Sequence, residues 1–426
     1  MNERHLALSI LMKTESEGAY SNIEINKTFA AADIDSRGKA FVTNIVYGVL
    51  QNKIRLDYII SQFSKLPMKK ITDDVKNILR MGLYQLIFMD KVPEYAVVNE
   101  SIKLVRKCKK ASSAGFVNAI LRGYIRNGIA YPKDALSYEC TYYSYPEWLG
   151  RLLYEAVGTD ATKIMASGNM TPPFSARVNT LKISRDEFIE KTGAKACTIC
   201  DDGVIFESGI SVSDDEMFRN GYYYPQDEAS MMPAKALSPK EGETVIDVCA
   251  APGGKTTHIA QLMGNKGKIF AFDIYKHKLK LIEDNAKRLG IDIISPVLQD
   301  ASEINDEYIS IADKVLVDAP CSGLGILRRK PEIKYNRTPE DLVSLSTLQQ
   351  KILGSSAKYV KPGGELVYST CTINPGENEK VIEEFLANNK NFELIDLDFE
   401  NSPYIKLFPH IHNTDGFFIA KVRRVL

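Results

Sequence analysis

From residue 243 onward, short apolar runs alternate with longer amphipathic segments, and this pattern constrains the fold more than any other feature of the chain. Strands that alternate with helices predict a parallel, doubly wound sheet. We expect seven strands, at 244–248, 268–273, 293–298, 314–318, 365–369, 393–397 and 417–422. Helices are expected between most of them, notably over 277–289, 339–359 and 378–388. In such a sheet, ligands bind at the carboxyl ends of the strands, near the point where the strand order reverses.

The rest of the chain has a different character. Apolar residues recur only at helical spacing in the first 130 residues, for example over 75–88, which predicts an all-α bundle. After an aromatic connector, strand-like runs such as 204–206 accompany a helical piece at 184–191, which is typical of a small α/β subdomain. We therefore expect three domains: a helical domain over 1–135, a connector with the small α/β subdomain over 136–235, and a Rossmann-like domain over 236–426.

The charge is unevenly distributed. The whole chain holds 54 basic and 54 acidic residues, but residues 1–130 hold 20 Lys and Arg against 12 Asp and Glu, a net charge of +8. A basic module of this kind is typical of contact with a polyanion, although an uneven solvated surface would look the same. The basic residues that we expect to face RNA are Lys103, Arg106, Lys107, Lys109, Lys110, Arg122 and Arg126.

The cellular compartment follows from what the sequence lacks. No run approaches the eighteen apolar residues that a membrane span needs, and the start of the chain has no signal-peptide pattern. Seven cysteines, an odd number scattered over 426 residues, argue against a disulfide framework. We expect a cytoplasmic monomer with no membrane partner.

The segment Asp247–Thr256 follows a predicted strand and opens a helix. Gly253 and Gly254 let the backbone approach a ligand closely. A phosphate-binding P-loop would need glycine five positions before Gly254, where Cys249 stands, and the three glycines of a dinucleotide fingerprint are missing. The turn therefore suits a nucleoside ligand without a diphosphate.

Two acidic residues end the next strands. Asp273 lies 19 positions after Gly254, where an acidic residue usually accepts the ribose hydroxyls of a nucleoside. An Asp at a strand end is otherwise most often a helix cap, and the glycine turn upstream favours the ribose role. Asp300 ends the third strand, where its carboxylate could accept an adenine amino group.

Two thiols follow adjacent strands. Cys321 stands in Asp318-Ala-Pro-Cys321, and Cys371 in Tyr368-Ser-Thr-Cys371. Free cysteines are usually buried apolar residues, but a pair at the ligand-binding edge beside a carboxylate indicates chemistry. A thiolate that adds to C6 of cytosine makes C5 nucleophilic enough to attack a methyl sulfonium. A base then removes the C5 proton and the thiol leaves.

No metal site is expected. Cys197-x-x-Cys200 is a single pair with no second pair and no histidine nearby in the sequence, which argues against structural zinc. Cys108 and Cys140 are interpreted as packing residues.

Taken together, Asp247–Thr256, Asp318–Gly325 and Ser369–Thr372 resemble the signature motifs of the RNA cytosine-C5 (m5C) methyltransferase family. The likeness extends through residues 177–182, 226–230 and 414–418. The N-terminal bundle is similar to the RNA-binding antitermination factor NusB, in residues 41–50, 92–100 and 115–122. This combination resembles the RsmB type of the family and covers nearly the whole chain.

The resemblance implies S-adenosyl-L-methionine as cofactor and one cytosine of small-subunit (16S) rRNA, free or in an early assembly intermediate, as substrate. It implies that Cys371 is the nucleophile, that Cys321 assists release of the product, and that Asp318 contacts the cytosine edge. It also implies that the cofactor site contains Cys249, Ala250, Ala251, Pro252, Gly253, Gly254, Lys255, Asp273, Asp300 and Asp318.

Three alternatives remain open: m5C methylation of tRNA, methylation of DNA, and a non-catalytic NusB-like assembly or antitermination factor. DNA enzymes share the Pro-Cys thiol but lack the second, Thr-Cys thiol, so the pair of Cys321 and Cys371 favours RNA. The intact Asp318 and both thiols argue against a non-catalytic factor.

Overall fold

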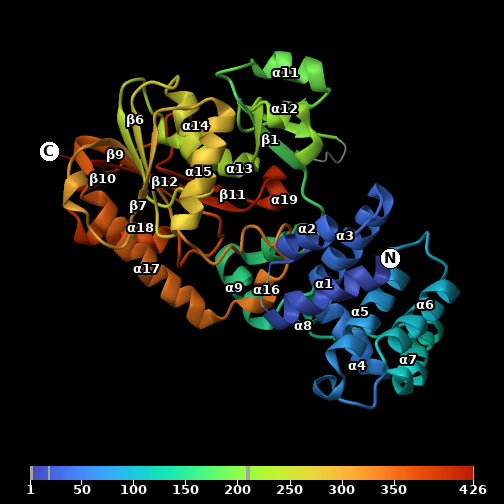
Figure 1. The fold of residues 1–426 in the computed structure, drawn as a ribbon. Helices are drawn as coiled ribbons and strands as arrows, with labels where there is room; N and C mark the ends of the chain where they lie inside the picture. Colours follow the sequence, from blue (N-terminus) through green and yellow to red (C-terminus); the bar gives the residue numbers. More distant parts are fainter. Residues whose placement is uncertain (1–2, 18–19, 208–211, 426) are drawn as a thin grey trace. The chain divides into compact units, whose positions relative to one another are not determined.

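The computed structural model describes residues 3–17, 20–207 and 212–425. The chain forms two compact units. The first contains Met1–Met170 and the segment Leu327–Asn336, and the second contains Thr171–Ile326 and Arg337–Leu426. Figure 1 shows the helices and strands of both units, coloured along the chain. None of the described helices is long and apolar enough to cross a membrane.

Helices make up the described part of the first unit, as the apolar spacing predicted. Helix α5 (Asp73–Phe88) forms its centre, with every residue from Asn77 to Gln85 buried. Helix α3 (Ser36–Gln51) passes close to it at Gly48, where a Cβ atom would lie 1.9 Å from Cζ of Tyr84. The other main helices are α1 (Glu3–Glu17), α2 (Ser21–Ala31), α4 (Lys53–Phe63), α6 (Glu94–Lys107), α7 (Ala114–Asn127), α8 (Ala135–Tyr143), α9 (Glu147–Val157) and α10 (Ala161–Ser167).

The segment Leu327–Asn336 packs into this helical unit although it follows the Cys321 loop in the chain. The Glu332 carboxylate accepts the backbone N–H of Ser21 at 3.1 Å. The fully buried Lys334, in α16 (Ile333–Asn336), donates to Gln51 O at 2.9 Å and to Asn169 Oδ1 at 3.0 Å. Burial lowers the pKa of Lys334 to about 7. These buried contacts hold the segment in the helical unit, because Glu332 and Lys334 would lose their hydrogen-bond partners without it.

A small antiparallel sheet begins the second unit. Its strands lie in the order β2 (Lys195–Ala196), β3 (Gly203–Phe206), β1 (Phe174–Val178) and β4 (Tyr223–Pro225). Helix α11 (Arg185–Thr192) contributes the buried Phe188, which packs with Val204 and Tyr223. The expected α/β subdomain is therefore present, with its strands close to the predicted runs.

The large sheet has eight strands, where the sequence predicted seven. Its order is β10 (Phe392–Leu394), β12 (Phe417–Arg424), β9 (Val360–Thr370), β8 (Ala312–Asp318), β5 (Thr244–Asp247), β6 (Lys268–Asp273) and β7 (Ile294–Leu298), with β11 (Tyr404–Leu407) paired to β12. The strands from β7 to β9 are parallel, but β12 runs antiparallel to β9, β10 and β11. The prediction of a purely parallel sheet is thus wrong at this edge, and the additional strand is β11.

Two helical layers cover the sheet, and alternation along the strands assigns its faces. Val315 and Val317 of β8 pack in the core with α17 (Pro339–Ala357) and α18 (Glu379–Asn388). Leu316, between them, packs in the core with α13 (Glu228–Leu237), α14 (Gly254–Leu262) and α15 (Lys276–Leu289). Figure 1 shows α17 and α18 on one side of the strands and α14 and α15 on the other. The chain leaves β5 toward β6 and β7 and returns to β8 on its other side, so the strand order reverses at β5.

Candidate active site

The loop after β5 forms a tight turn into helix α14. Ala250 N donates to Phe272 O at 2.8 Å, and Gly253 N donates to Ala250 O at 2.7 Å. Gly253 has φ of 101°, a conformation that favours glycine, and a Cβ atom there would lie 3.3 Å from Cα of Ile282. The first N–H groups of α14 are therefore brought to the carboxyl edge of the sheet, as the glycine pair predicted.

Asp247, at the end of β5, has one unsatisfied carboxylate oxygen. Thr256 Oγ1 donates to its Oδ2 at 2.6 Å, whereas the buried Oδ1 finds no hydrogen-bond partner among the described residues. Burial raises the pKa of Asp247 to about 7. Since a buried acceptor without a partner is costly, this oxygen is suited to receive a donor or a cationic group from a ligand.

Four carboxylates converge on Cys249, beside this turn. Burial raises the pKa of the Cys249 thiol, and the charges of Asp247, Asp318, Asp273 and Asp300 add to the effect. Carboxylates from four strand ends thus act on the Cys249 position. Asp273, Asp300 and Asp318 were expected in the site, Asp247 was not, and Lys255 balances the charge of Asp318. Such a site favours a ligand that carries positive charge.

Asp273 and Asp300 each use one oxygen for local backbone. Asp273 Oδ1 accepts Tyr275 N at 2.9 Å, and Asp300 Oδ1 accepts Ser302 N at 2.8 Å. Asp273 is only 8% exposed. Asp273 therefore binds the backbone two residues further on and does not cap α15, whose N-cap is Tyr275, while a carboxylate retains further acceptor capacity for ligand hydroxyls.

Lys255 joins the glycine turn to the thiol edge. Its Nζ lies 2.7 Å from Asp318 Oδ2 and 3.0 Å from Ser230 Oγ. Ser369 Oγ donates to the other oxygen, Asp318 Oδ1, at 2.8 Å. Burial lowers the pKa of Lys255, but the charges of Asp318 and Cys371 outweigh it and raise that pKa. The ammonium group therefore stays charged and holds the Asp318 carboxylate in place.

The two thiols predicted to act together are in contact. Asp318 pairs with Ser369 in the parallel register of β8 and β9, so the loops that follow these strands leave the sheet side by side. Cys321 Sγ lies 3.2 Å from Cys371 Sγ, and Gly325 N donates to Cys371 O at 3.0 Å. A hydrogen bond between the sulfurs allows one proton to be shared between them.

The surroundings of the two thiols are not equivalent. The hydrogen bond to Cys371 raises the pKa of Cys321, and burial and the charge of Glu377 raise it further. The Lys255 ammonium, in contrast, is close enough to Cys371 to respond to its charge. The raised pKa of Cys321 favours its protonated form, so the proton shared by the pair is better placed on Cys321.

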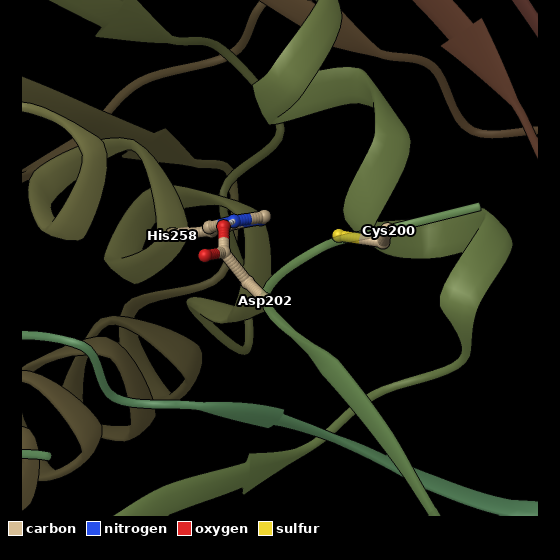
Figure 2. A group of neighbouring side chains, drawn as sticks. All are labelled: Cys200, Asp202 and His258. Atoms are coloured by element: carbon tan, nitrogen blue, oxygen red, sulfur yellow. Dashed lines mark hydrogen bonds and ion pairs between the residues drawn. The ribbon is translucent and has the colours of Figure 1, made fainter. Parts of the chain in front are cut away.

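A second buried cluster lies away from the thiols. Cys200, Asp202 and His258 offer ligand atoms within 4.8 Å of one another, and Figure 2 shows the three side chains turned toward a common point. The histidine that reaches Cys200 is not its neighbour in the sequence, because His258 comes from the distant helix α14. In the described structure, His258 Nε2 already bonds to Asp202 Oδ2 at 2.9 Å, and Lys235 Nζ lies 3.6 Å from the same oxygen. We therefore interpret the cluster as a polar link between the small sheet and α14.

Acid is expected to destabilise the protein through His258. Burial, with the nearby charge of Arg177, lowers the pKa of His258 from 6.5 to about 4. Because unfolded chains take up this proton first, stability is lost as the pH falls from 6.5 through 4, by about 3 kcal/mol in all. Urea unfolding midpoints of wild type and His258→Gln over this range measure the effect, since glutamine keeps a donor for Asp202 but does not titrate.

The quantity to compare is the difference in urea unfolding midpoint between wild type and His258→Gln at each pH. Asp247 titrates in the opposite direction, because its raised pKa makes stability increase as the pH falls from about 7. His277→Gln, at an exposed position, is the matched control and should follow wild type. Equal pH dependence of His258→Gln and wild type would show that His258 does not remain neutral when buried.

Comparison with known proteins gives the class of this protein. The family 16S rRNA methyltransferase RsmB/F matches residues 234–423, its ferredoxin-like domain matches residues 145–213, and the NusB family matches residues 1–126. The second unit, with the glycine turn and the thiol edge, is thus the catalytic part of an RNA methyltransferase. The chain belongs to the RsmB/F family of 16S rRNA methyltransferases, in the form that carries a NusB domain.

Relatives of the whole chain support this placement. The probable ribosomal RNA small subunit methyltransferase B of Bacillus subtilis is 38% identical and covers 99% of this chain and 98% of its own length. The enzyme of that name from Klebsiella pneumoniae is 33% identical over 91% of both chains. The crystal structure of PH0851 covers 100% of this chain and 99% of its own, with a TM-score of 0.85 and 29% identity. NSun6 from Pyrococcus horikoshii, solved with SFG, covers 66% of this chain and 98% of its own, with a TM-score of 0.59 and 30% identity.

Proposed function

We propose that this protein transfers the methyl group of S-adenosyl-L-methionine to C5 of one cytosine in small-subunit rRNA, through a covalent bond between Cys371 and C6. The observation that carries the proposal is the pair of thiols, 3.2 Å apart, beside the Lys255–Asp318 ion pair at the carboxyl edge of the sheet. The names of the relatives support rRNA as the substrate.

The residues present fit the cofactor. When bound, S-adenosyl-L-methionine supplies a methyl group on a positively charged sulfur. The carboxylates around Cys249 favour that charge, and the unpartnered Asp247 Oδ1 offers an acceptor to the amino group of the methionine part. Asp273 would receive the ribose hydroxyls and Asp300 the adenine amino group. At Gly253 the missing Cβ faces Ile282, so this glycine lets the turn pack against α15 beside the proposed nucleoside site.

Cys371 acts as the nucleophile in this mechanism. Its thiolate forms the S–C6 bond, and the electron pair of the C5–C6 double bond moves into the ring, toward C5 and N3. N3 takes a proton from water as negative charge develops there, and the Cys321 thiol returns a proton to that water and so becomes a thiolate. Asp318, fixed by Lys255 and Ser369, contacts the cytosine edge and orients the ring for the transfer. C5 supplies the electron pair for its bond to the methyl carbon, while the bond from that carbon to the sulfonium sulfur would break with its pair remaining on sulfur, which leaves a neutral thioether.

Cys321 then completes the cycle. Its thiolate removes the C5 proton, the C5–C6 double bond forms again, and the S–C6 bond breaks with its electron pair returning to Cys371. The N3 proton passes to water. One proton is therefore released for each methyl group transferred, and both thiols regain their initial forms.

Mapping 5-methylcytosine in rRNA from cells with and without this protein tests the proposal. We expect one cytosine of small-subunit rRNA to lose its methyl group and to regain it with the wild-type chain. Methylation confined to tRNA or DNA would assign the thiol pair to another nucleic acid. Absence of radiolabelled methyl transfer to total RNA, rRNA and early assembly intermediates included, would favour the non-catalytic assembly factor.

The first unit is proposed to supply RNA affinity. Arg106, Lys107, Lys109, Arg122 and Arg126 are exposed at the end of α6 and along α7. A groove of about 460 Å³ between these helices is lined by Tyr95, which is 71% exposed, and by Arg122 and Arg126. Exposed aromatic and arginine side chains suit stacked bases and phosphates.

Reversing two of these charges is expected to weaken RNA binding. Arg122→Glu with Arg126→Glu should flatten the slope of log K against log salt by about 1.5, the value for two lost phosphate contacts, and leave cofactor affinity unchanged. Lys39→Glu with Lys163→Glu, on α3 and α10, makes the same change in net charge and is the control. Binding isotherms in which both double variants behave alike would reduce the basic face to a solvated surface. Substitution is preferable to deletion of the unit, which would expose the buried Lys334.

A further inference from the structure

One buried carboxylate joins the two loops that carry the thiols. Glu377 lies between β9 and α18, and its side chain is fully buried. Its carboxylate has no part in the chemistry proposed for Cys321 and Cys371. A buried charge is costly unless hydrogen bonds satisfy it, so its partners indicate what it does.

The partners of Glu377 are the residues that follow the two cysteines. Ser322, next to Cys321, donates its backbone N–H to Oε2 at 2.8 Å and its hydroxyl to Oε1 at 2.5 Å. Thr372, next to Cys371, places its hydroxyl 3.5 Å from the same Oε1 and 2.9 Å from Ser322 Oγ. A single carboxylate therefore fixes the chain immediately after each sulfur.

Two side-chain amides complete the shell around Glu377. Gln349 donates to Oε2 at 3.0 Å and also to Pro320 O at 2.9 Å, and Asn374 donates to Oε1 at 3.1 Å. Backbone N–H and amide NH2 groups can only donate, so both oxygens of Glu377 must accept. An amide in place of the carboxylate would direct its own N–H groups at one of these donors. The shell therefore requires a carboxylate and not only a side chain of this shape.

We propose that Glu377 is a positioning residue for the reaction: its carboxylate binds the residue after each cysteine and thereby holds the Cys321 and Cys371 sulfurs at hydrogen-bonding distance. The roles of the thiols rest on the function proposed above, but their spacing does not. The pKa of Cys321 is raised first by its hydrogen bond to Cys371 and then by burial. The charge of Glu377 raises this pKa further. Glu377 thus helps Cys321 to keep its proton without touching the substrate.

The first test needs no RNA. Diamide oxidises two neighbouring thiols to a disulfide and is itself reduced to the hydrazine, so its rate reports how often the sulfurs meet. In the full-length protein, Glu377→Gln should slow formation of the Cys321–Cys371 disulfide at least tenfold. Iodoacetamide labelling across pH should show the preference for Cys371 over Cys321 reduced at least tenfold. Glu365→Gln removes a half-buried carboxylate from the same sheet, where Glu365 binds Lys314, Lys421 and Arg423, and it should leave both readouts unchanged.

The second test measures catalysis. Glu377→Gln should lower the single-turnover rate of methyl transfer more than tenfold with little change in the RNA dissociation constant, whereas Glu365→Gln should only lower the melting temperature. If Glu377→Gln does not fold, Glu377→Asp is the second variant, because it keeps the charge but shortens the side chain by one methylene. It should form the Cys321–Cys371 disulfide more slowly and transfer the methyl group at a partly reduced rate. Wild-type disulfide and labelling rates in a folded, destabilised Glu377 variant would overturn the proposal and leave Glu377 a purely structural residue. A failure of the proposed function is distinguishable, because it would abolish methyl transfer in wild type and leave the thiol readouts intact.

Discussion

Incubated with substrate RNA and S-adenosyl-L-methionine, Cys321→Ala is expected to accumulate as a slowly migrating protein–RNA species on denaturing gels, and Cys371→Ala is expected to form none. The structure gives the reason. The sulfurs lie 3.2 Å apart, so either could reach the same ring. The charge of Glu377 raises the pKa of Cys321, whereas Cys371 is close enough to the Lys255 ammonium for its charge to raise the pKa of Lys255. Cys371 should therefore form the S–C6 bond, and without Cys321 no base removes the C5 proton, so the methylated adduct persists.

The controls for this prediction separate chemistry from folding. Both cysteines are partly exposed, and a thiol-to-methyl change at such a site costs on the order of 1 kcal/mol, so both variants should unfold near the wild-type temperature. The adduct should require the cofactor for full accumulation and be missing from the double variant. Trapping by Cys371→Ala instead would reverse the assignment. Loss of activity in both variants with no trapped RNA would argue against a covalent mechanism.

The site could be predicted from the sequence where the chemistry is local. A cysteine that directly follows a strand end must lie at the carboxyl edge of the sheet, so the motifs around Asp318 and Cys371 were sufficient to place both thiols there. The turn at Gly253 followed in the same way from a strand, two glycines and a helix. The roles of these residues remain predictions, since geometry brings them together but does not show them acting.

Contacts between distant segments could not be predicted. Nothing in Cys197-x-x-Cys200 signals His258, which reaches Asp202 across 56 positions of sequence. The segment that carries Lys334 looks like an ordinary loop between strand and helix, and its burial in the helical unit depends on backbone oxygens such as Gln51 O. Strand β11 is four residues long and pairs antiparallel with β12 at the edge of the sheet. Four residues are too few for an alternating pattern to be recognised in the sequence.

Glu377 shows the same limit within the active site. Its neighbours in the chain suggest only a turn before a helix, and its function depends on Ser322, 55 positions away. A signal was nevertheless present: a serine and a threonine follow the two cysteines, and paired hydroxyls at equivalent positions need a shared acceptor when they are buried. Polar residues beside catalytic ones therefore merit the same attention as the catalytic residues themselves.

Replacement of Asp273 by alanine is expected to weaken cofactor binding to the full-length protein by about 1.5–3 kcal/mol, or roughly ten- to more than a hundredfold. Asp273 is 8% exposed, keeps one oxygen on Tyr275 N, and is close enough to Cys249 for its charge to raise the pKa of that thiol, so it retains acceptor capacity next to the site. A buried charged acceptor for two ribose hydroxyls is worth more than a solvated one, since water cannot replace it once the site closes over the nucleoside. Titration calorimetry with S-adenosyl-L-methionine measures the loss.

An analogue of the cofactor without ribose hydroxyls makes the assignment specific. If Asp273 binds those hydroxyls, Asp273→Ala and wild type should bind the analogue almost equally, because the interaction is already missing from the ligand. Asp292→Ala, on the exposed turn after α15, removes the same charge from the second unit and should leave both affinities unchanged. Equal loss for cofactor and analogue would mean that Asp273 acts through its contact with Tyr275 N, by ordering the start of α15. Unchanged affinity for both ligands would place the nucleoside elsewhere on the sheet edge, and Asp300 would then be the next carboxylate to replace.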